Sequence, residues 1–365
     1  MRILCSRFAQ EIGGAEKSFF AHIRAFEALG HEVHAFTNLA LPESVEATTH
    51  DALWFRRSSK TYKVLVAPLQ ILSALRMVKR YDPDIINPHS RFDQILLSLL
   101  KPLHKKPLVW KDPVELKQRL EADTLASKLD KRALKRADKV YALSHEQKDQ
   151  LLPLLPAGFD RSRVEVVPSG IDFSQYDNAA EPTHQSSDLT IGYAARLHPA
   201  KGVDDLILAF ETMRKKHPAK LLIMGEGEHK LELEELVGNL GLADSVDFIP
   251  YTEDVSGFLR SLDIYACPSH YESWGLGVHE ARLFGLPIVA TNVGGLAEQI
   301  DDNVNGLLVP PKDSTALAQA IEKYIDDGEL RFRLGEAAEK DARERGDFAQ
   351  TVDSKLLPIF EECLS

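Results

Sequence analysis

The sequence predicts an α/β protein built from two doubly wound domains that face a cleft. Strand-like and helix-like segments alternate along residues 1–170, which indicates parallel βαβ units. A polar, turn-rich stretch follows at 171–188, and the alternation then restarts, so this stretch is the expected linker. The chain of 365 residues is also too long for one ordinary core, and two domains of roughly 150–200 residues each are expected.

In the first domain, residues 1–170, short apolar runs are separated by longer segments with helical spacing. The expected strands are Ile3–Cys5, Glu32–Phe36, Asp84–Asn87, Pro107–Trp110, Lys139–Leu143 and Val164–Val167. The expected helices are Ala15–Leu29, Val64–Val78 and Leu125–Arg136. The apolar Val64–Val78 segment fits a core helix, with a membrane-facing helix as the alternative. Ser144 is a candidate helix N-cap, because a serine hydroxyl accepts hydrogen bonds from free N–H groups of the first turn.

The second domain, residues 189–345, repeats this alternation. Its expected strands are Leu189–Ala194, Lys220–Met224, Val246–Ile249, Ile264–Ala266 and Ile288–Thr291. Helices are expected at Val203–Lys216 and Lys230–Leu240, and three more from about Ser314. We expect the last of these, 346–365, to cross back and pack on the first domain. In doubly wound domains the carboxyl ends of the strands face the ligand-binding crevice.

Charge is distributed unevenly along the chain. Residues 1–170 carry 27 lysines and arginines against 20 acidic residues, whereas the rest of the chain carries 17 against 35. A basic first half suggests an anionic partner, with ordinary solvated surface charge as the alternative. No apolar run reaches the roughly 18 residues that span a bilayer, and no secretion signal is recognised. We therefore expect a cytoplasmic protein, peripheral on the inner face of the membrane if it contacts a membrane at all.

The stretch from Pro268 to Glu280 is the most informative motif. It places Glu272 and Glu280 on either side of a glycine-rich turn from a strand into a helix. Backbone N–H groups at such a turn carry the positive end of the helix dipole and suit a phosphate. Ionised carboxylates only accept hydrogen bonds, so they suit hydroxyl groups. A phosphate between two sets of hydroxyls describes a nucleotide-sugar.

Two cations and a glycine turn in the same domain fit this ligand. Arg196 follows a strand end, and Lys201 precedes a helix. Together they would hold a diphosphate and stabilise charge on a leaving phosphate. Gly225, in Gly225-Glu226-Gly227, permits close backbone approach after a strand, with a simple turn as the alternative. The sequence offers no Asp-x-Asp pair or His/Cys cluster that would indicate a required metal.

Together these motifs resemble the retaining glycosyltransferases of family 4, whose GT-B fold pairs two Rossmann-like domains. The resemblance implies that Arg196 and Lys201 bind the phosphates, that Glu272 holds the transferred sugar and that Glu280 holds the ribose. It also implies that the donor meets the backbone N–H groups of Gly275, Leu276 and Gly277. The second domain would then bind the nucleotide-sugar and the first domain the acceptor.

In the first domain the resemblance is less complete. Gly13 and Gly14 match a glycine pair that approaches the donor phosphate, with a tight turn as the alternative. His89 matches a histidine that often follows a strand in this family and is a candidate catalytic residue, although a structural histidine is equally consistent. Many members also carry a histidine near Trp110-Lys111-Asp112, and none is present here. We therefore assign Lys111 and Asp112 to the acceptor side, with surface or turn roles left open.

The resemblance predicts a metal-independent hexosyltransferase that transfers a sugar with retention from a nucleotide-diphosphate sugar to an acceptor hydroxyl. A UDP-sugar is favoured over a GDP-sugar, and the acceptor would be a glycan or a lipid-linked glycan, as in glycan, lipopolysaccharide or glycolipid synthesis. No cofactor and no nucleic-acid partner are expected. Two alternatives stay open: a nucleotide-sugar epimerase or isomerase on the same fold, and a non-catalytic module that binds nucleotide-sugars or glycans.

Overall fold

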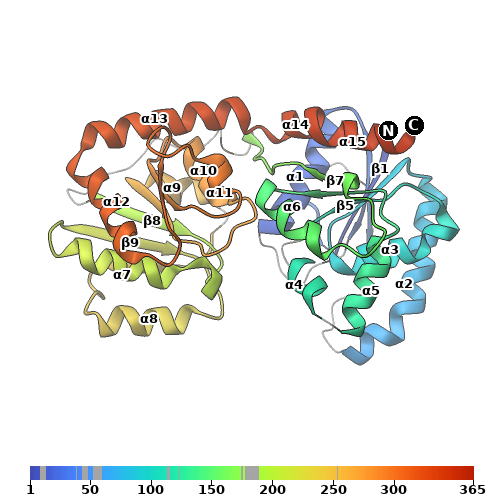
Figure 1. The fold of residues 1–365 in the computed structure, drawn as a ribbon, viewed down its shortest axis with the longest axis horizontal. Helices are drawn as coiled ribbons and strands as arrows, with labels where there is room; N and C mark the ends of the chain where they lie inside the picture. The colour runs from blue at the N-terminus through green and yellow to red at the C-terminus, as the bar shows by residue number, and fades with distance from the viewer. Residues whose placement is uncertain are drawn as a thin grey trace. The chain divides into compact units, whose positions relative to one another are not determined.

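The computed structural model describes residues 1–8, 14–37, 39–42, 48–51, 60–112, 116–122, 124–173, 176, 189–252 and 254–365. The chain divides into two compact units. The first unit comprises Met1–Ser169 and Phe348–Ser365, and the second unit comprises Gly170–Asp347. Figure 1 shows the elements of each unit. Most of the expected linker and the predicted site residue Gly13 lie outside the described residues.

The described residues of the first unit form a four-stranded and a three-stranded sheet, both parallel. Their strands are β1 (Arg2–Arg7), β2 (Glu32–Thr37), β3 (Thr48–Asp51), β4 (Ile85–Pro88), β5 (Val109–Lys111), β6 (Lys139–Ala142) and β7 (Val164–Val166). The order is β3-β2-β1-β4, and a bridge between Ile86 and Leu108 continues it to β5-β6-β7. The strand order therefore reverses between β1 and β4, which is the topological switch point of this unit.

Helices cover both faces of these sheets, because successive side chains of a strand point to opposite faces. Ile3 and Cys5 of β1 pack with α1 (Gly14–Ala28) and with the C-terminal segment. That segment consists of α14 (Phe348–Thr351), a π-helical turn (Val352–Leu356) and α15 (Leu357–Leu364). Leu4 of β1 packs on the other face, which four helices cover: α2 (Lys60–Tyr81), α3 (Arg91–His104), α4 (Leu116–Glu121) and α5 (Leu125–Leu134). Helix α6 (His145–Leu151) follows β6, and Ser144 caps it by accepting from the Gln147 N–H, as predicted.

The second unit contains one six-stranded parallel sheet of order β10-β9-β8-β11-β12-β13. Its strands are β8 (Leu189–Ala194), β9 (Ala219–Met224), β10 (Val246–Ile249), β11 (Ile264–Cys267), β12 (Ile288–Thr291) and β13 (Leu307–Val309). Its helices are α7 (Val203–Arg214), α8 (Lys230–Asn239), α9 (Val255–Arg260), α10 (Leu276–Leu283), α11 (Leu296–Gln299), α12 (Ser314–Asp326) and α13 (Gly328–Arg345). This order also reverses once, between β8 and β11.

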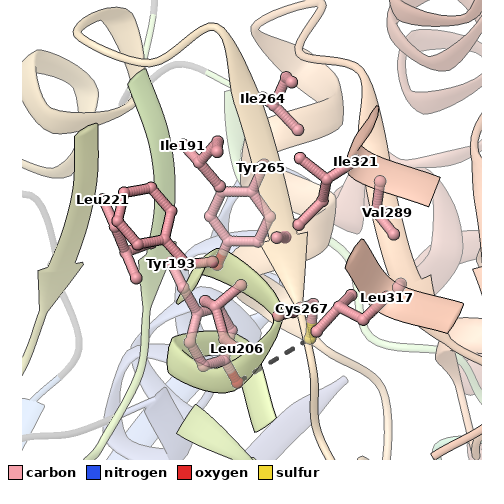
Figure 2. Close-up of a cluster of buried hydrophobic side chains, with 14 of the residues drawn as sticks. Ile191, Tyr193, Leu206, Leu221, Ile264, Tyr265, Cys267, Val289, Leu317 and Ile321 are labelled. Carbon is pink, nitrogen blue, oxygen red and sulfur yellow. Dashed lines mark hydrogen bonds between the residues drawn. The ribbon is translucent and has the colours of Figure 1, made fainter. Parts of the chain in front are cut away.

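The core of the second unit is continuous from its central strands to α7 and α12. Figure 2 shows Ile191 and Tyr193 of β8 beside Tyr265 and Cys267 of β11, with Leu206 of α7 packed close by. Strands that are buried on both faces read as apolar runs rather than as alternating patterns, which is typical of parallel sheets. The predicted strands Leu189–Ala194, Val246–Ile249 and Ile288–Thr291 therefore coincide with β8, β10 and β12.

Among the described residues, the sequence prediction missed the strands β3 and β13 and the helices α3, α4 and α9. The signal for α3 was present, since Ser90 and Asp93 form a capping box at its start. The segment of α2 that we could interpret either as core or as membrane-facing packs Ala74, Met77 and Val78 into the core. No helix in the described part of the chain is both long enough and apolar enough to cross a bilayer.

Candidate functional site

The switch point of the second unit brings together residues that are far apart in the sequence. Arg196 and Lys201 follow β8, whereas Glu272 follows β11, and these two strands are neighbours in the sheet. The carboxyl ends of both strands lie at the same edge, where open α/β sheets bind their ligands. The structure therefore brings Lys201 and Glu272 together, although 71 positions separate them.

Lys201 and Glu272 form an ion pair in which the Lys201 ammonium donates to Glu272 Oε2. Both side chains are mostly buried. Burial alone would lower the pKa of Lys201, but the adjacent Glu272 carboxylate outweighs it and raises this pKa above its usual value. Lys201 therefore carries a fixed positive charge throughout the neutral pH range.

Arg196 differs from Lys201 in its exposure. Its side chain is largely solvent-exposed and donates to Glu228 Oε2 at 3.2 Å. An exposed ion pair of this kind contributes at most about 1 kcal/mol to stability, so it is easily exchanged for another anion. Arg196 is therefore an exposed cation that can exchange its anionic partner, at the same edge as the mostly buried cation Lys201.

The start of α10 supplies backbone N–H groups to this edge. Gly275 is the N-cap residue with φ of 89°, and Leu276 and Gly277 begin the helix. The first N–H groups of a helix have no intrahelical acceptor and carry the positive end of its dipole. Gly277 is required by packing as well, because a Cβ there would lie 2.6 Å from the Tyr265 hydroxyl.

Gly294 and Gly295 pack directly against the backbone of the loop that carries Glu272. The sequence did not reveal this contact. A Cβ on Gly294 would lie 1.7 Å from the Glu272 carbonyl oxygen, and one on Gly295 would lie 2.4 Å from Trp274 Cα. The Gln299 side chain donates to the Trp274 carbonyl and fixes the same loop. These residues position Glu272 through its backbone.

Gly225 has a comparable role for the loop that carries Arg196. It follows β9 with φ of 148°, and a Cβ there would lie 1.8 Å from the Ala195 carbonyl oxygen. The close approach that the sequence predicted therefore exists, and its partner is the protein backbone next to Arg196. His270 donates from Nε2 to Asp205 at 2.6 Å and was not predicted; it fixes the segment before Glu272.

Glu280 lies in the second turn of α10 and is buried. The Tyr176 hydroxyl donates to Glu280 Oε1 at 2.6 Å. Burial and the Glu280 carboxylate both raise the pKa of Tyr176 above its usual value, so the phenol stays protonated. Glu280 is not part of a capping box, because the N-cap of α10 is Gly275.

The switch point of the first unit carries a different set of groups. His89 follows β4 and is buried; its Nε2 donates to Asn87 Oδ1 at 2.7 Å, while its Nδ1 has no partner among the described residues. The imidazole ring of His22 packs edge-on against it, with 4.7 Å between ring centroids. Burial is the main reason that the pKa of His89 lies well below its usual value, so the ring is neutral.

Lys111 reaches the same cluster from the end of β5. Its Nζ donates to Ser18 Oγ of α1 at 2.6 Å. Burial, reinforced by the charge of Arg7 and opposed by Glu16, lowers the pKa of Lys111 to about 7. His22, which the sequence analysis missed, donates from Nδ1 to the Ser18 carbonyl and accepts from the Tyr141 hydroxyl. The four-residue spacing of Ser18 and His22 places both on one helix face, and this pattern could have predicted that they lie together.

Gly14 and Asp112 complete the predicted set. Gly14 is the first residue of α1. Asp112 is buried, and its Oδ1 has no partner in the described part of the chain. Burial raises the pKa of Asp112 well above its usual value, with Arg119 opposing the shift. No group of three or more His, Cys, Asp or Glu side chains among the described residues is arranged to hold a metal ion.

Curated relatives of this chain are glycosyltransferases. A D-inositol 3-phosphate glycosyltransferase of Salinispora arenicola is 31% identical over 253 residues, which cover 63% of this chain and 56% of the relative. The corresponding enzyme of Corynebacterium jeikeium is 34% identical and covers 52% and 50%. The chain thus spans about half the length of the curated relatives it matches.

Solved structures share the fold across nearly the whole chain. HepE of Anabaena, in complex with UDP and glucose, matches with a TM-score of 0.83 at 20% identity and covers 98% of both chains. Sucrose-phosphate synthase of Thermosynechococcus elongatus matches with a TM-score of 0.85 at 19% identity and covers 99% of both chains. At these identities the matches establish the fold, which is GT-B.

Family models account for most of the sequence. The model for glycosyltransferase family 4 matches residues 12–175, and the model for glycosyl transferases group 1 matches residues 175–341. The two matches meet at the boundary between the two units. With the fold and the carboxyl-edge cluster of the second unit in agreement, the chain belongs to the family 4 glycosyltransferases.

Proposed function

We propose that this protein is a retaining, metal-independent hexosyltransferase that uses a nucleotide-diphosphate sugar. The observation that carries the proposal is the Lys201–Glu272 pair beside the α10 N-terminus at the switch point of the second unit. A cation, free N–H groups and a carboxylate are the complement of a diphosphate joined to a sugar.

In this proposal the donor diphosphate takes the place of protein carboxylates at both cations. The exposed Arg196–Glu228 pair exchanges Glu228 for a phosphate, and the donor competes with Glu272 for Lys201. Glu272 is then available to accept hydrogen bonds from sugar hydroxyls. A UDP-sugar is favoured over a GDP-sugar, and the UDP and UDP-glucose complexes of HepE support this choice.

The reaction would proceed by attack from the face that the leaving group occupies. The bond between the anomeric carbon and the phosphate oxygen breaks, and its electron pair passes to the phosphate. The acceptor oxygen bonds to the same face of the anomeric carbon, and its proton passes to the departing phosphate. Arg196 and Lys201 supply the charge that stabilises this phosphate as it leaves.

We infer that the first unit binds the acceptor, a glycan or a lipid-linked glycan, in the cytoplasm. The support is the group of Arg7, His89 and Lys111 at the carboxyl edge of its sheet, which suits hydroxyl and anionic groups. The name of the relatives, D-inositol 3-phosphate glycosyltransferase, is consistent with an anionic acceptor. Contact between this basic part of the chain and an anionic membrane surface is part of the same proposal.

A donor panel tests the proposal directly. Thermal unfolding would be followed with UDP-, GDP- and ADP-sugars, since a ligand that binds only the native state raises the melting temperature. We expect stabilisation by a UDP-sugar, followed by transfer to an acceptor with retention, detected by NMR of the product. Interconversion of the donor sugar without acceptor would indicate an epimerase instead, and binding without any turnover would indicate a non-catalytic module.

A further inference from the structure

The outer surface of three adjacent helices in the first unit is unusually apolar. Helix α3 contacts α2 on one side and α5 on the other, and the three lie beside one another in Figure 1. Their solvent-facing sides expose Ile71, Leu72, Leu99, Leu103, Leu125 and Leu129. Leu103 and Leu125 are 67% and 85% exposed, so they contribute little to the core beneath. We call this surface the outer helical face.

The same face carries no exposed acidic residue on its helices. The sequences of α2, α3 and α5 contain only two acids, Asp93 and Asp130, and both are buried. Asp93 accepts from Ser6 and from the Ser90 N–H, and Asp130 pairs with Arg91. Neither carboxylate therefore offsets the positive charge outside.

Exposed cations are carried by α2 and α5 or directly follow α5. Arg76 and Lys79 of α2, Arg132 of α5 and the following Lys135 are exposed. Each has no carboxylate partner among the residues that the structure describes. Cations near the end of a helix complement its dipole, which explains part of this placement. The helix dipole does not explain the exposed leucines or the missing acids.

We propose that the outer helical face binds the surface of an anionic lipid bilayer. Leucine and isoleucine side chains would enter the boundary between headgroups and acyl chains, while Lys and Arg contact lipid phosphates. A nucleic acid would satisfy the cations but would offer no hydrocarbon to the six apolar side chains. The inference deepens the membrane contact in the proposed function by naming the surface that makes it.

The second unit provides an internal contrast. Leu231 of α8 is 73% exposed, but its neighbours Glu232, Glu234 and Glu235 are exposed acids. An anionic bilayer would repel that helix despite its leucine. The outer helical face is thus distinguished by the combination of exposed leucines with unopposed cations, and Leu231 supplies a matched control.

Vesicle co-sedimentation of the full chain tests the proposal. Binding would be measured on phosphatidylcholine vesicles with and without phosphatidylglycerol, at low and high salt, and in the absence of any donor. We expect binding only with phosphatidylglycerol, and weaker binding as salt rises. The Arg132→Gln/Lys135→Gln variant should bind roughly 25-fold more weakly, at about fivefold per cation. Leu103→Ser/Leu129→Ser should lose roughly tenfold.

The control variants Leu231→Ser and Lys215→Gln, both at exposed positions of the second unit, should bind like the wild type. Equal binding to vesicles without phosphatidylglycerol, or unchanged binding by both double variants, would overturn the proposal. Retention on heparin without vesicle binding would also overturn it and assign the face to a hydrophilic polyanion. Because the assay uses no donor, a failure of the proposed transferase activity would leave its result intact.

Discussion

The two units place their candidate functional groups at equivalent switch points of their sheets. The charge states of these groups differ between the units. In the second unit Lys201 keeps its positive charge beside Glu272, and the Arg196 side chain is largely exposed to solvent. In the first unit burial keeps His22 and His89 neutral and lowers the pKa of Lys111 to about 7. The comparison shows that one edge carries a permanent positive charge, whereas the other carries a lysine whose protonation changes near neutral pH.

Removing the fixed cation should have the largest effect. We expect Lys201→Ala to lower kcat/KM roughly 100-fold, about 2.7 kcal/mol, because the leaving phosphate loses its stabilising charge and Glu272 loses its partner. Steady-state kinetics with the donor identified in the panel would measure this. Lys216→Ala removes an exposed lysine that pairs with Glu322 and should stay within about twofold of wild type. An equal loss of kcat/KM in both variants would show that Lys201 has no role beyond that of an ordinary surface lysine.

Moving the carboxylate loop should come next. In Gly294→Ala a Cβ would collide with the Glu272 carbonyl oxygen at a residue with φ of 49°, so we expect a loss of roughly 2 kcal/mol in stability and weaker donor binding. Denaturant unfolding and donor titration would measure both. Gly238→Ala is the control, since its Cβ meets nothing within 4 Å inside α8; it should gain up to about 1 kcal/mol. Unchanged stability and donor binding in Gly294→Ala would show that the contact with Gly294 does not fix the Glu272 loop.

The buried lysine of the first unit predicts a pH effect on stability. Its pKa is about 7 in the folded protein and near 10.5 in the unfolded chain, so between these values the unfolded chain binds more protons and stability rises with pH. Compared with Lys111→Met, the wild type should therefore become more stable from about pH 7 to pH 10. Urea unfolding at several pH values would measure the difference. A parallel pH dependence in the two proteins would contradict the burial of a titrating amine.

The smallest effect should come from the tyrosine that is hydrogen-bonded to Glu280. Tyr176→Phe removes the hydroxyl that donates to this carboxylate and leaves the ring in place. If Glu280 binds the donor ribose, the variant should change donor KM by no more than a few-fold, and Glu280→Ala should raise it about tenfold or more. A larger effect of Tyr176→Phe than of Glu280→Ala would make Glu280 a structural partner of Tyr176.

Much of this arrangement could be predicted from the sequence, and the remainder depends on tertiary geometry. Buried parallel strands are continuous apolar runs, so five of the six described strands of the second unit were predicted almost residue by residue, and β13 was missed. Arg196, Lys201 and Glu272 were identified from their positions after strand ends, but the Lys201–Glu272 pair depends on β8 and β11 being neighbours. The role of Gly294 could not be predicted, because its close contact with the Glu272 carbonyl joins two separate segments of the chain.

Prediction was less complete in the first unit for a related reason. His22 lies within a helix, and its surroundings include Tyr141 of β6 and His89, which follows β4. The lowered pKa of Lys111 results mainly from burial, which a sequence pattern does not reveal. Residue types at strand ends therefore indicated a candidate site, while the charge states of Lys201 and Lys111 depend on their packed surroundings.

Calorimetric titration with UDP and with uridine tests the central claim most directly, namely that the charged edge of the second unit binds a diphosphate. Wild-type protein should bind UDP and show at least about 100-fold weaker binding of uridine, because uridine lacks the charged group that Arg196, Lys201 and the α10 N-terminus would hold. Arg196→Ala should reduce UDP affinity about tenfold or more while leaving the fold unchanged. Equal affinities for UDP and uridine, or unchanged UDP binding by Arg196→Ala and Lys201→Ala, would contradict the claim.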